Sequence, residues 1–242
     1  MIYLVLGMHK SGTTLVSEIL HHSGIPMGDI DTSLTYDDAN QYEDQESLHL
    51  NMELIGAPDY EVLHLKAPDP PVATPEQTER MRRFIADRSA RDADWGFKDP
   101  RTALVYPLWE QELPEHRIIA VWRYPEEVWP RFAAPGPGLY HQEPKRAWSF
   151  VQRWCEYNQG MLDAVAGKRH SSIVLNYGEF MSNDSVFMRL QDFVGIPLQD
   201  RRRKSMYRSR RKRHPSYEIA KRIVRTSLGY DPDAIVRRLE AV

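Results

Sequence analysis

The chain has 242 residues, of which 41% are hydrophobic, and a formal net charge of −2 from 32 basic and 34 acidic side chains. This length allows one sizeable hydrophobic core, and the composition excludes a disordered chain. Its apolar runs are far shorter than the roughly 20 residues that span a bilayer, residues 2–6 are too short for a signal peptide, and the single cysteine, Cys155, excludes an internal disulfide. We therefore expect one cytoplasmic domain over residues 1–242, without a membrane span.

The pattern of apolar residues predicts strands that alternate with helices. The run 118–122 is apolar throughout, as is typical of a parallel strand that is covered on both faces. The alternation predicts an α/β fold with a central parallel sheet and helices on both faces. Strands are expected at residues 2–6, 95–98, 118–122 and 173–175, and helices at 15–23, 41–55, 75–89, 101–111, 125–132, 144–166 and 186–194.

The segment Gly-Met-His-Lys-Ser-Gly-Thr-Thr, residues 7–14, joins the first strand to the first helix. Two glycines allow a tight turn, and the hydroxyls and backbone N–H groups at the positive end of the helix suit a phosphate. The spacing of Gly7 and Gly12 matches the start of a Walker A loop, but two threonines stand where that motif has Lys followed by Ser or Thr. The lysine lies instead at Lys10, which counts against an ATP-dependent enzyme. The loop predicts a P-loop-type, three-layer fold that binds a phosphorylated nucleotide.

Residues 10–19, Lys-Ser-Gly-Thr-Thr-Leu-Val-Ser-Glu-Ile, resemble the 5′-phosphosulfate loop of the sulfotransferases that use 3′-phosphoadenosine 5′-phosphosulfate (PAPS) and release PAP, including their bacterial branch. The resemblance implies that Lys10 contacts the 5′-phosphate and the bridging oxygen of the donor. The cytosolic branch stacks adenine on a tryptophan at the position of Leu15, so adenine must be held differently here. The residues implied to wrap the phosphate are Ser11, Gly12, Thr13 and Thr14.

Residues 119–128, Ile-Ala-Val-Trp-Arg-Tyr-Pro-Glu-Glu-Val, are similar to the 3′-phosphate motif of this family, a strand that ends in Arg-x-Pro-x-x-Val. Arg123 is then the implied 3′-phosphate ligand, because a guanidinium gives two parallel hydrogen bonds. Eight residues further on, the family has a serine where this chain has Arg131. Arg131 is expected to add a second positive contact to the 3′-phosphate, unless that contact comes from another residue. Tyr177 matches a tyrosine that reaches adenine in related enzymes; its alternative place is the core.

A basic segment lies near the end of the chain, where residues 201–225 hold 12 of the 32 Lys and Arg and one acid, Glu218. Such a segment suits nucleic acid, an acidic membrane surface or a nucleotide's phosphates. Few aromatic residues are interleaved, so we expect no nucleic-acid partner. The family's C-terminal clamp is not recognisable, and residues 201–242 are expected to form a basic helical segment. Candidates to close over the 3′-phosphate are Arg208, Arg210 and Arg211, with a solvated basic face as the alternative.

The segment Trp-Gly-Phe-Lys-Asp-Pro-Arg, residues 95–101, resembles one in bacterial sulfotransferases whose lysine faces the sulfuryl group. Lys98 would stabilise charge on the sulfuryl oxygens, or else would form a structural ion pair with Asp99 or another acid. Arg101 is expected to orient the substrate or to bind a helix.

A general base is needed for the acceptor hydroxyl, and the histidine of the cytosolic Lys-Thr-His segment is absent here. Tyr42-Glu43-Asp44 resembles the stretch that carries a base glutamate in bacterial and carbohydrate-directed members, which makes Glu43 the candidate and Asp44 the second choice. The alternative is that these acids simply favour a helix N-terminus. His9, in the loop, is expected to contact donor or acceptor, or to be structural.

No group of His, Cys and carboxylates has metal-ligand spacing, so no metal is expected. The predicted function is transfer of a sulfuryl group from PAPS to a hydroxyl of a carbohydrate or other small molecule. Two alternatives are an ATP-dependent P-loop phosphotransferase and a non-catalytic protein that binds an anionic partner through residues 201–225. The sequence predicts neither the acceptor nor the oligomeric state.

Overall fold

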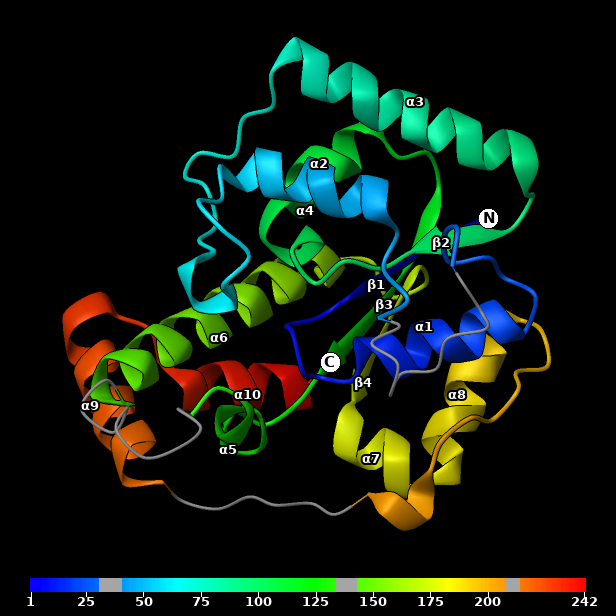
Figure 1. Cartoon of the computed structure of the whole chain (residues 1–242). Helices are drawn as coiled ribbons and strands as arrows, with labels where there is room; N and C mark the ends of the chain where they lie inside the picture. Colours follow the sequence, from blue (N-terminus) through cyan, green and yellow to red (C-terminus); the bar gives the residue numbers. More distant parts are fainter. Residues whose placement is uncertain (31–40, 134–142, 208–213) are drawn as a thin grey trace.

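A four-stranded parallel sheet forms the centre of the computed structural model, which describes residues 1–30, 41–133, 143–207 and 214–242 (Figure 1). The strands lie in the order β2-β1-β3-β4. Their bounds are β1 Ile2–Leu6, β2 Trp95–Phe97, β3 His116–Trp122 and β4 Ser172–Asn176. The helices are α1 Thr13–His22, α2 Gln45–Ile55, α3 Pro75–Arg91, α4 Thr102–Glu112, α5 Pro125–Val128, α6 Glu143–Val165, α7 Tyr177–Ser182, α8 Asp184–Val194, α9 Pro215–Leu228 and α10 Pro232–Glu240. Short 3₁₀ turns lie at Val62–His64, Trp129–Arg131 and Lys204–Met206.

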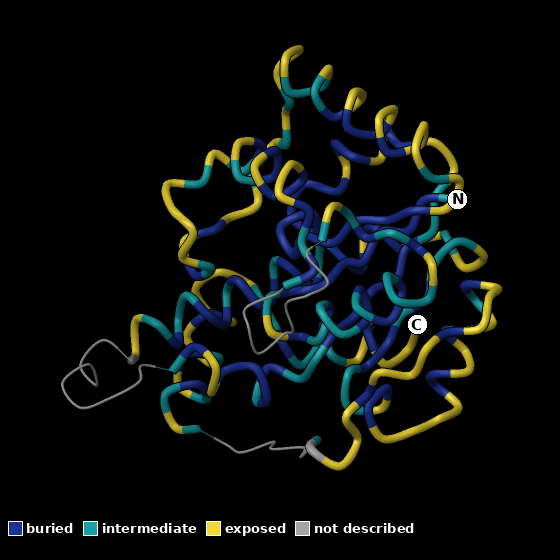
Figure 2. Tube along the Cα trace, turned by 45° about the vertical axis from the view of Figure 1, so that its right-hand side comes forward, coloured by how far each residue is buried: buried dark blue, intermediate teal, exposed yellow. Residues whose placement is uncertain are grey.

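Each face of the sheet packs into its own hydrophobic core. Successive side chains of a strand point to opposite faces, so in β1 Leu4 and Leu6 enter one core and Tyr3 and Val5 the other. The first core includes side chains from α2, α3, α4, α6, α9 and α10, and the second those from α1, α7 and α8. Figure 2 shows the buried residues gathered in the sheet and in the helix faces that cover it. The predicted α/β fold with helices on both faces of a parallel sheet is confirmed.

Several element boundaries differ from the predicted ones for local reasons. The helix expected over 41–55 begins only at Gln45, because the side chain of Asp44 caps it by accepting hydrogen bonds from the N–H groups of Glu46 and Ser47. The helix expected over 125–132 divides into α5 and a 3₁₀ turn, because Pro130 has no N–H to continue the α-helical hydrogen bonds. The strand expected over 95–98 ends at Phe97.

The first turn of α3, the helix expected over 75–89, is closed by a capping box between Thr74 and Gln77. The N–H of Gln77 donates to the hydroxyl of Thr74 at 3.2 Å, and the N–H of Thr74 donates to the side chain of Gln77 at 2.9 Å. At the other end of the chain, the expected basic helical segment contains α9 and α10. No helix within the described residues combines the length and the hydrophobicity that a bilayer crossing requires.

Candidate functional site

A cavity lies beyond the carboxyl ends of β1 and β3, where the loop of residues 7–14 leaves the sheet. In an open parallel sheet, this edge is where ligands bind. The cavity brings together most of the predicted site residues, although they come from five separate parts of the chain. Those that line it are Lys10, Gly12, Thr13, Thr14, Glu43, Arg123, Arg131 and Tyr177.

The phosphate loop has an unusual backbone. Lys10 adopts φ +67°, a left-handed conformation that side-chain-bearing residues seldom take and that is common at functional sites. The hydroxyl of Ser11 donates to the carbonyl of Met8 at 2.6 Å, so this side chain supports the turn from within instead of lining the cavity. Gly12 precedes α1 and supplies no side-chain cap, which leaves the first N–H groups of α1 available to an anion.

Gly12 is also required by the packing of Tyr177 against the loop. A Cβ atom at Gly12, where φ is +104°, would lie 2.0 Å from Cδ2 of Tyr177. The same ring covers the guanidinium of Arg123, whose Cζ lies 4.9 Å from the ring centroid. Tyr177 therefore contacts both the phosphate loop and the arginine at the end of β3, and it lines the cavity between them.

Arg123 is fixed from two sides. Its Nε donates to Oε2 of the buried Glu127 at 2.9 Å, and its carbonyl accepts from the indole N–H of Trp154 at 3.2 Å. The ion pair uses Nε, and none of the described residues bonds the two terminal nitrogens, which form the edge that can bind an anion bidentately. Arg131 adds a second positive side chain to the same cavity. The other candidates for the 3′-phosphate, Arg208, Arg210 and Arg211, lie outside the described residues.

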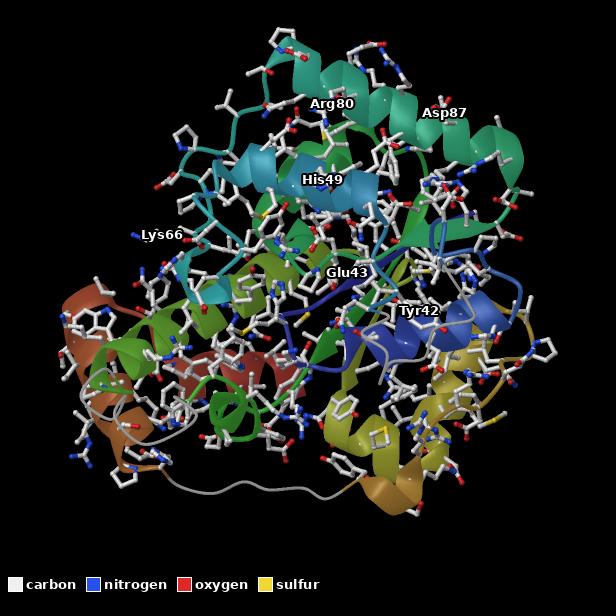
Figure 3. All side chains as sticks on the ribbon, viewed as in Figure 1. Tyr42, Glu43, His49, Lys66, Arg80 and Asp87 are labelled. Carbon is white, nitrogen blue, oxygen red and sulfur yellow. The ribbon has the colours of Figure 1, made fainter. Side chains whose placement is uncertain are left out.

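Lys98 and Glu43 form an ion pair behind the phosphate loop. The Nζ of Lys98 lies 2.7 Å from Oε1 of Glu43 and 3.5 Å from Oγ1 of Thr14, and the Lys98 side chain has no exposed surface. Burial lowers the pKa of Lys98, and the carboxylate of Glu43 opposes that shift. Glu43 precedes α2 and lies near the centre of the molecule (Figure 3), where it lines the cavity. Two roles were expected for Lys98, stabilisation of the sulfuryl oxygens or an ion pair with an acid. The structure contains an ion pair, and its acid is Glu43.

Asp44, the second choice as base, is engaged elsewhere. Its side chain is buried, caps α2 and accepts from the guanidinium of Arg88 at 2.5 Å. It does not line the cavity. The two neighbouring acids thus have different roles in the structure, because Asp44 caps α2 and Glu43 lines the cavity.

A second buried network lies where β2 joins α4. Asp99 accepts from the guanidinium of Arg101 at 2.7 Å and from the amide of Asn51 at 2.9 Å. Asn51 also donates to the hydroxyl of Thr102 and accepts from the indole of Trp109, so it fixes α2 against α4. Burial raises the pKa of Asp99, and the charge of Arg101 opposes this.

His9 lies close enough to both networks to be influenced by the charges of Lys98 and Arg101, and it lines the cavity. Both its ring nitrogens are buried without a hydrogen-bond partner among the described residues. Its ring meets that of Tyr157 edge-on, with centroids 5.8 Å apart. Burial lowers the pKa of His9 well below its usual range, and the charges of Arg101, Lys98 and Lys10 add to the shift, so the imidazole is neutral near pH 7.

Several residues of the cavity were not among the sequence candidates. Glu18 follows Thr14 by four positions and so lies on the same face of α1, a signal that the sequence does contain. Arg201 pairs with Glu18 at 2.7 Å, which brings the start of the basic segment to the cavity, and this pairing across 183 positions has no sequence signal. The others that line the cavity are Leu15, Gln41, Pro100, Met181 and Arg203. Within the described ranges, no cluster of His, Cys, Asp and Glu has the geometry to hold a metal ion.

Comparison with known proteins identifies the family. The sequence model of the sulfotransferase family matches residues 3–200, whereas no curated protein sequence matches significantly. The sulfotransferase domain of the Synechococcus PCC 7002 olefin synthase has a TM-score of 0.53 at 16% identity, with 99% of this chain and 93% of that chain covered. The sulfotransferase domain from the curacin biosynthetic pathway has a TM-score of 0.52 at 15% identity, with 90% and 82% covered. These structural matches show a shared P-loop-type α/β fold, and the family match covers most of the sequence: the chain belongs to the sulfotransferase family.

Proposed function

We propose that this protein transfers a sulfuryl group from PAPS to a hydroxyl of a carbohydrate or another small molecule. The observation that carries the proposal is the single cavity in which two anion-binding groups meet. One is the N-terminus of α1 with Lys10, and the other is Arg123 with Arg131. A nucleotide with phosphates at both its 5′ and 3′ positions needs two such groups, whereas ATP carries all its phosphates at one end.

The donor's parts suit different walls of the cavity. In the proposal, Lys10 and the loop residues 11–14 bind the 5′-phosphosulfate, and the terminal nitrogens of Arg123 bind the 3′-phosphate. Tyr177 packs beside both Gly12 of the loop and Arg123. Adenine would lie against the apolar side chains of Leu15 and Met181, in place of the tryptophan of the cytosolic branch.

The transfer itself requires one proton acceptor and compensation of charge. In our proposal, Glu43 takes the proton of the acceptor hydroxyl as its oxygen forms a bond to sulfur, and the bond between sulfur and the bridging phosphate oxygen breaks. Lys10 offsets the negative charge that develops on the departing PAP. Lys98 holds the Glu43 side chain in place through their 2.7 Å contact.

The cellular setting is also part of the proposal. The motif resemblances are to bacterial members, and Cys155 is a free thiol in the core, where burial raises its pKa. Both features suit the reducing cytoplasm of a bacterium.

Ligand-dependent thermal stability tests the donor assignment. PAP is expected to raise the melting temperature more than AMP, which lacks the 3′-phosphate, and ATP with magnesium is expected to have little effect. Lys10→Ala should weaken the binding of both PAP and AMP. Arg123→Ala should reduce the affinity for PAP to the affinity for AMP, which is a loss of about 10- to 100-fold for one charge-assisted contact.

The exposed Lys66 provides a matched control, because it does not line the cavity, and Figure 3 shows it apart from Glu43 at the edge of the molecule. Lys66→Ala should bind PAP like the wild type. Stabilisation by ATP with magnesium, together with none by PAP, would overturn the proposed function in favour of a phosphotransferase. Salt-sensitive binding of DNA or RNA that survives Lys10→Ala would favour a non-catalytic role of the basic segment.

A further inference from the structure

The cavity wall about one helical turn beyond the phosphate loop contains a carboxylate to which the proposed function gives no role. Glu18 follows Thr14 by four positions on α1, so the two side chains lie on one face of that helix. Met181 has the same relation to Tyr177 on α7. Thr14 and Tyr177 stand in the first turns of helices that lead away from the same edge of the sheet. Glu18 and Met181 therefore line the part of the cavity that lies farther from the phosphate loop.

Only one oxygen of the Glu18 carboxylate is engaged. Nε of Arg201 donates to Oε1 at 2.7 Å, and no group in the described part of the chain bonds Oε2. This second oxygen is unpaired but not buried, and 18% of the side chain is exposed, so a bound molecule can reach it. Arg201 thus fixes a carboxylate that presents a free acceptor to the cavity.

A carboxylate is unexpected in a cavity proposed to bind two phosphates, because like charges repel. Its use is to accept a hydrogen bond, and PAP has two donors apart from its phosphates, the 6-amino group of adenine and the 2′-hydroxyl of the ribose. The 2′-hydroxyl adjoins the 3′-phosphate, which Arg123 is proposed to bind. Glu18 instead lies beside Leu15 and Met181, the apolar residues proposed to contact adenine. Its position therefore favours the amino group.

We infer that Glu18 selects the base of the donor by accepting a hydrogen bond from the 6-amino group of adenine through Oε2. This inference rests on the proposed function and adds a specificity-determining residue to the same site. Leu15 and Met181 supply apolar contacts that any purine would share, whereas the contact with Glu18 depends on the substituent at position 6. A purine with a carbonyl there, as in inosine, would place an acceptor against a carboxylate and should be rejected.

Titration calorimetry with PAP and inosine 3′,5′-bisphosphate, on the wild type and on Glu18→Gln, tests the inference. Both compounds keep the two phosphates, so only the base is compared. The wild type should bind PAP about 10- to 100-fold more tightly, as expected for a hydrogen bond to a charged group. In Glu18→Gln the amide oxygen can still accept from Arg201, which leaves the amide NH₂ facing the cavity. This donor suits a carbonyl, so the variant should lose the preference for PAP or reverse it.

Glu112→Gln is the matched control. Glu112 accepts from Nε of Arg82 at 2.6 Å, and 11% of its side chain is exposed, but it does not line the cavity. The control variant should lose a similar ion pair and keep the wild-type preference for PAP. Melting temperatures of the two variants, measured without ligand, show that both are folded at the temperature of the titration.

Three results would contradict the inference. The wild type binds the two compounds equally, Glu18→Gln retains the wild-type preference, or Glu18→Gln and the wild type bind 2′-deoxyadenosine 3′,5′-bisphosphate equally, which would place Glu18 at the ribose. A wild type that binds neither PAP nor the inosine compound contradicts the proposed function instead.

Discussion

At the scale of single residues, the site depends on how buried charges are paired. Lys98 has no exposed surface, and its ammonium forms an ion pair with the carboxylate of Glu43. Glu43 is therefore both the proposed base and the counter-ion of a buried cation, two roles that a single substitution cannot separate. A pair of substitutions can.

We predict that Glu43→Gln lowers both turnover and stability, and that adding Lys98→Met restores only the stability. Removing one partner of a buried pair costs about 3–5 kcal/mol, because the other charge stays buried, while an apolar replacement of both is close to neutral. Denaturant unfolding and PAPS turnover, measured on the single and double variants, check this. PAP binding should survive in the double variant. Turnover that returns along with stability would remove Glu43 from the chemistry.

His9 gives a prediction about pH. Its pKa is depressed in the folded protein, whereas in the unfolded chain it is near 6.5. Above that value the residue is neutral in both states and contributes nothing, and below it the unfolded chain binds the proton more readily, so folding loses free energy as the pH falls. The wild type should therefore lose more stability than His9→Leu between about pH 7.5 and pH 5.5, by up to roughly 1.4 kcal/mol per unit below 6.5. Equal losses in the two proteins would contradict a neutral, buried His9. The pKa values of His21 and His22 are also lowered, but both proteins contain them.

At the scale of secondary-structure elements, the junction of β1 and α1 depends on the close approach of α7. Tyr177 is the first residue of α7, and Asn176 caps that helix by accepting from the N–H of Glu179 at 3.1 Å. The helix start holds the Tyr177 ring against Gly12, where there is no room for a side chain. The geometry of the phosphate loop thus depends on an element more than 160 positions away.

Two glycine substitutions separate this packing from backbone strain. Gly12 and Gly24 have similar φ values, +104° and +96°, but a Cβ at Gly24 would meet no atom within 4 Å. Gly24→Ala should cost only the backbone strain of about 1 kcal/mol, while Gly12→Ala should cost about 1–3 kcal/mol more and abolish PAP binding, because Tyr177 must move. Urea unfolding and PAP titration measure both effects. Equal costs for the two variants would show that Tyr177 yields without penalty.

At the scale of the whole molecule, the sequence predicted the layers better than the contacts between them. The strands were predictable because parallel strands covered on both faces are apolar throughout, as in residues 118–122. The loop at residues 7–14 was predictable as a candidate anion site because its glycines, its hydroxyls and the following helix all lie in one short segment of the sequence. Ion pairs such as Lys98 with Glu43 and Arg201 with Glu18 were not predictable from the sequence, because they join parts of the chain that only the fold brings together. The unpaired ring nitrogens of His9 were equally hidden, since a missing partner is visible only in three dimensions.

The position of Tyr177 has a consequence for selectivity. Its ring packs against Gly12 and also against the guanidinium of Arg123, so one rigid side chain contacts both proposed anion-binding groups. Because both groups are packed against the same ring, we expect the cavity to suit one span between two phosphates. A nucleotide with its second phosphate on the 2′-oxygen has the same charge and composition but a different span. Such a nucleotide would contact only one of the two anion-binding groups at a time. The protein would then distinguish the two isomers by the distance between their phosphates alone.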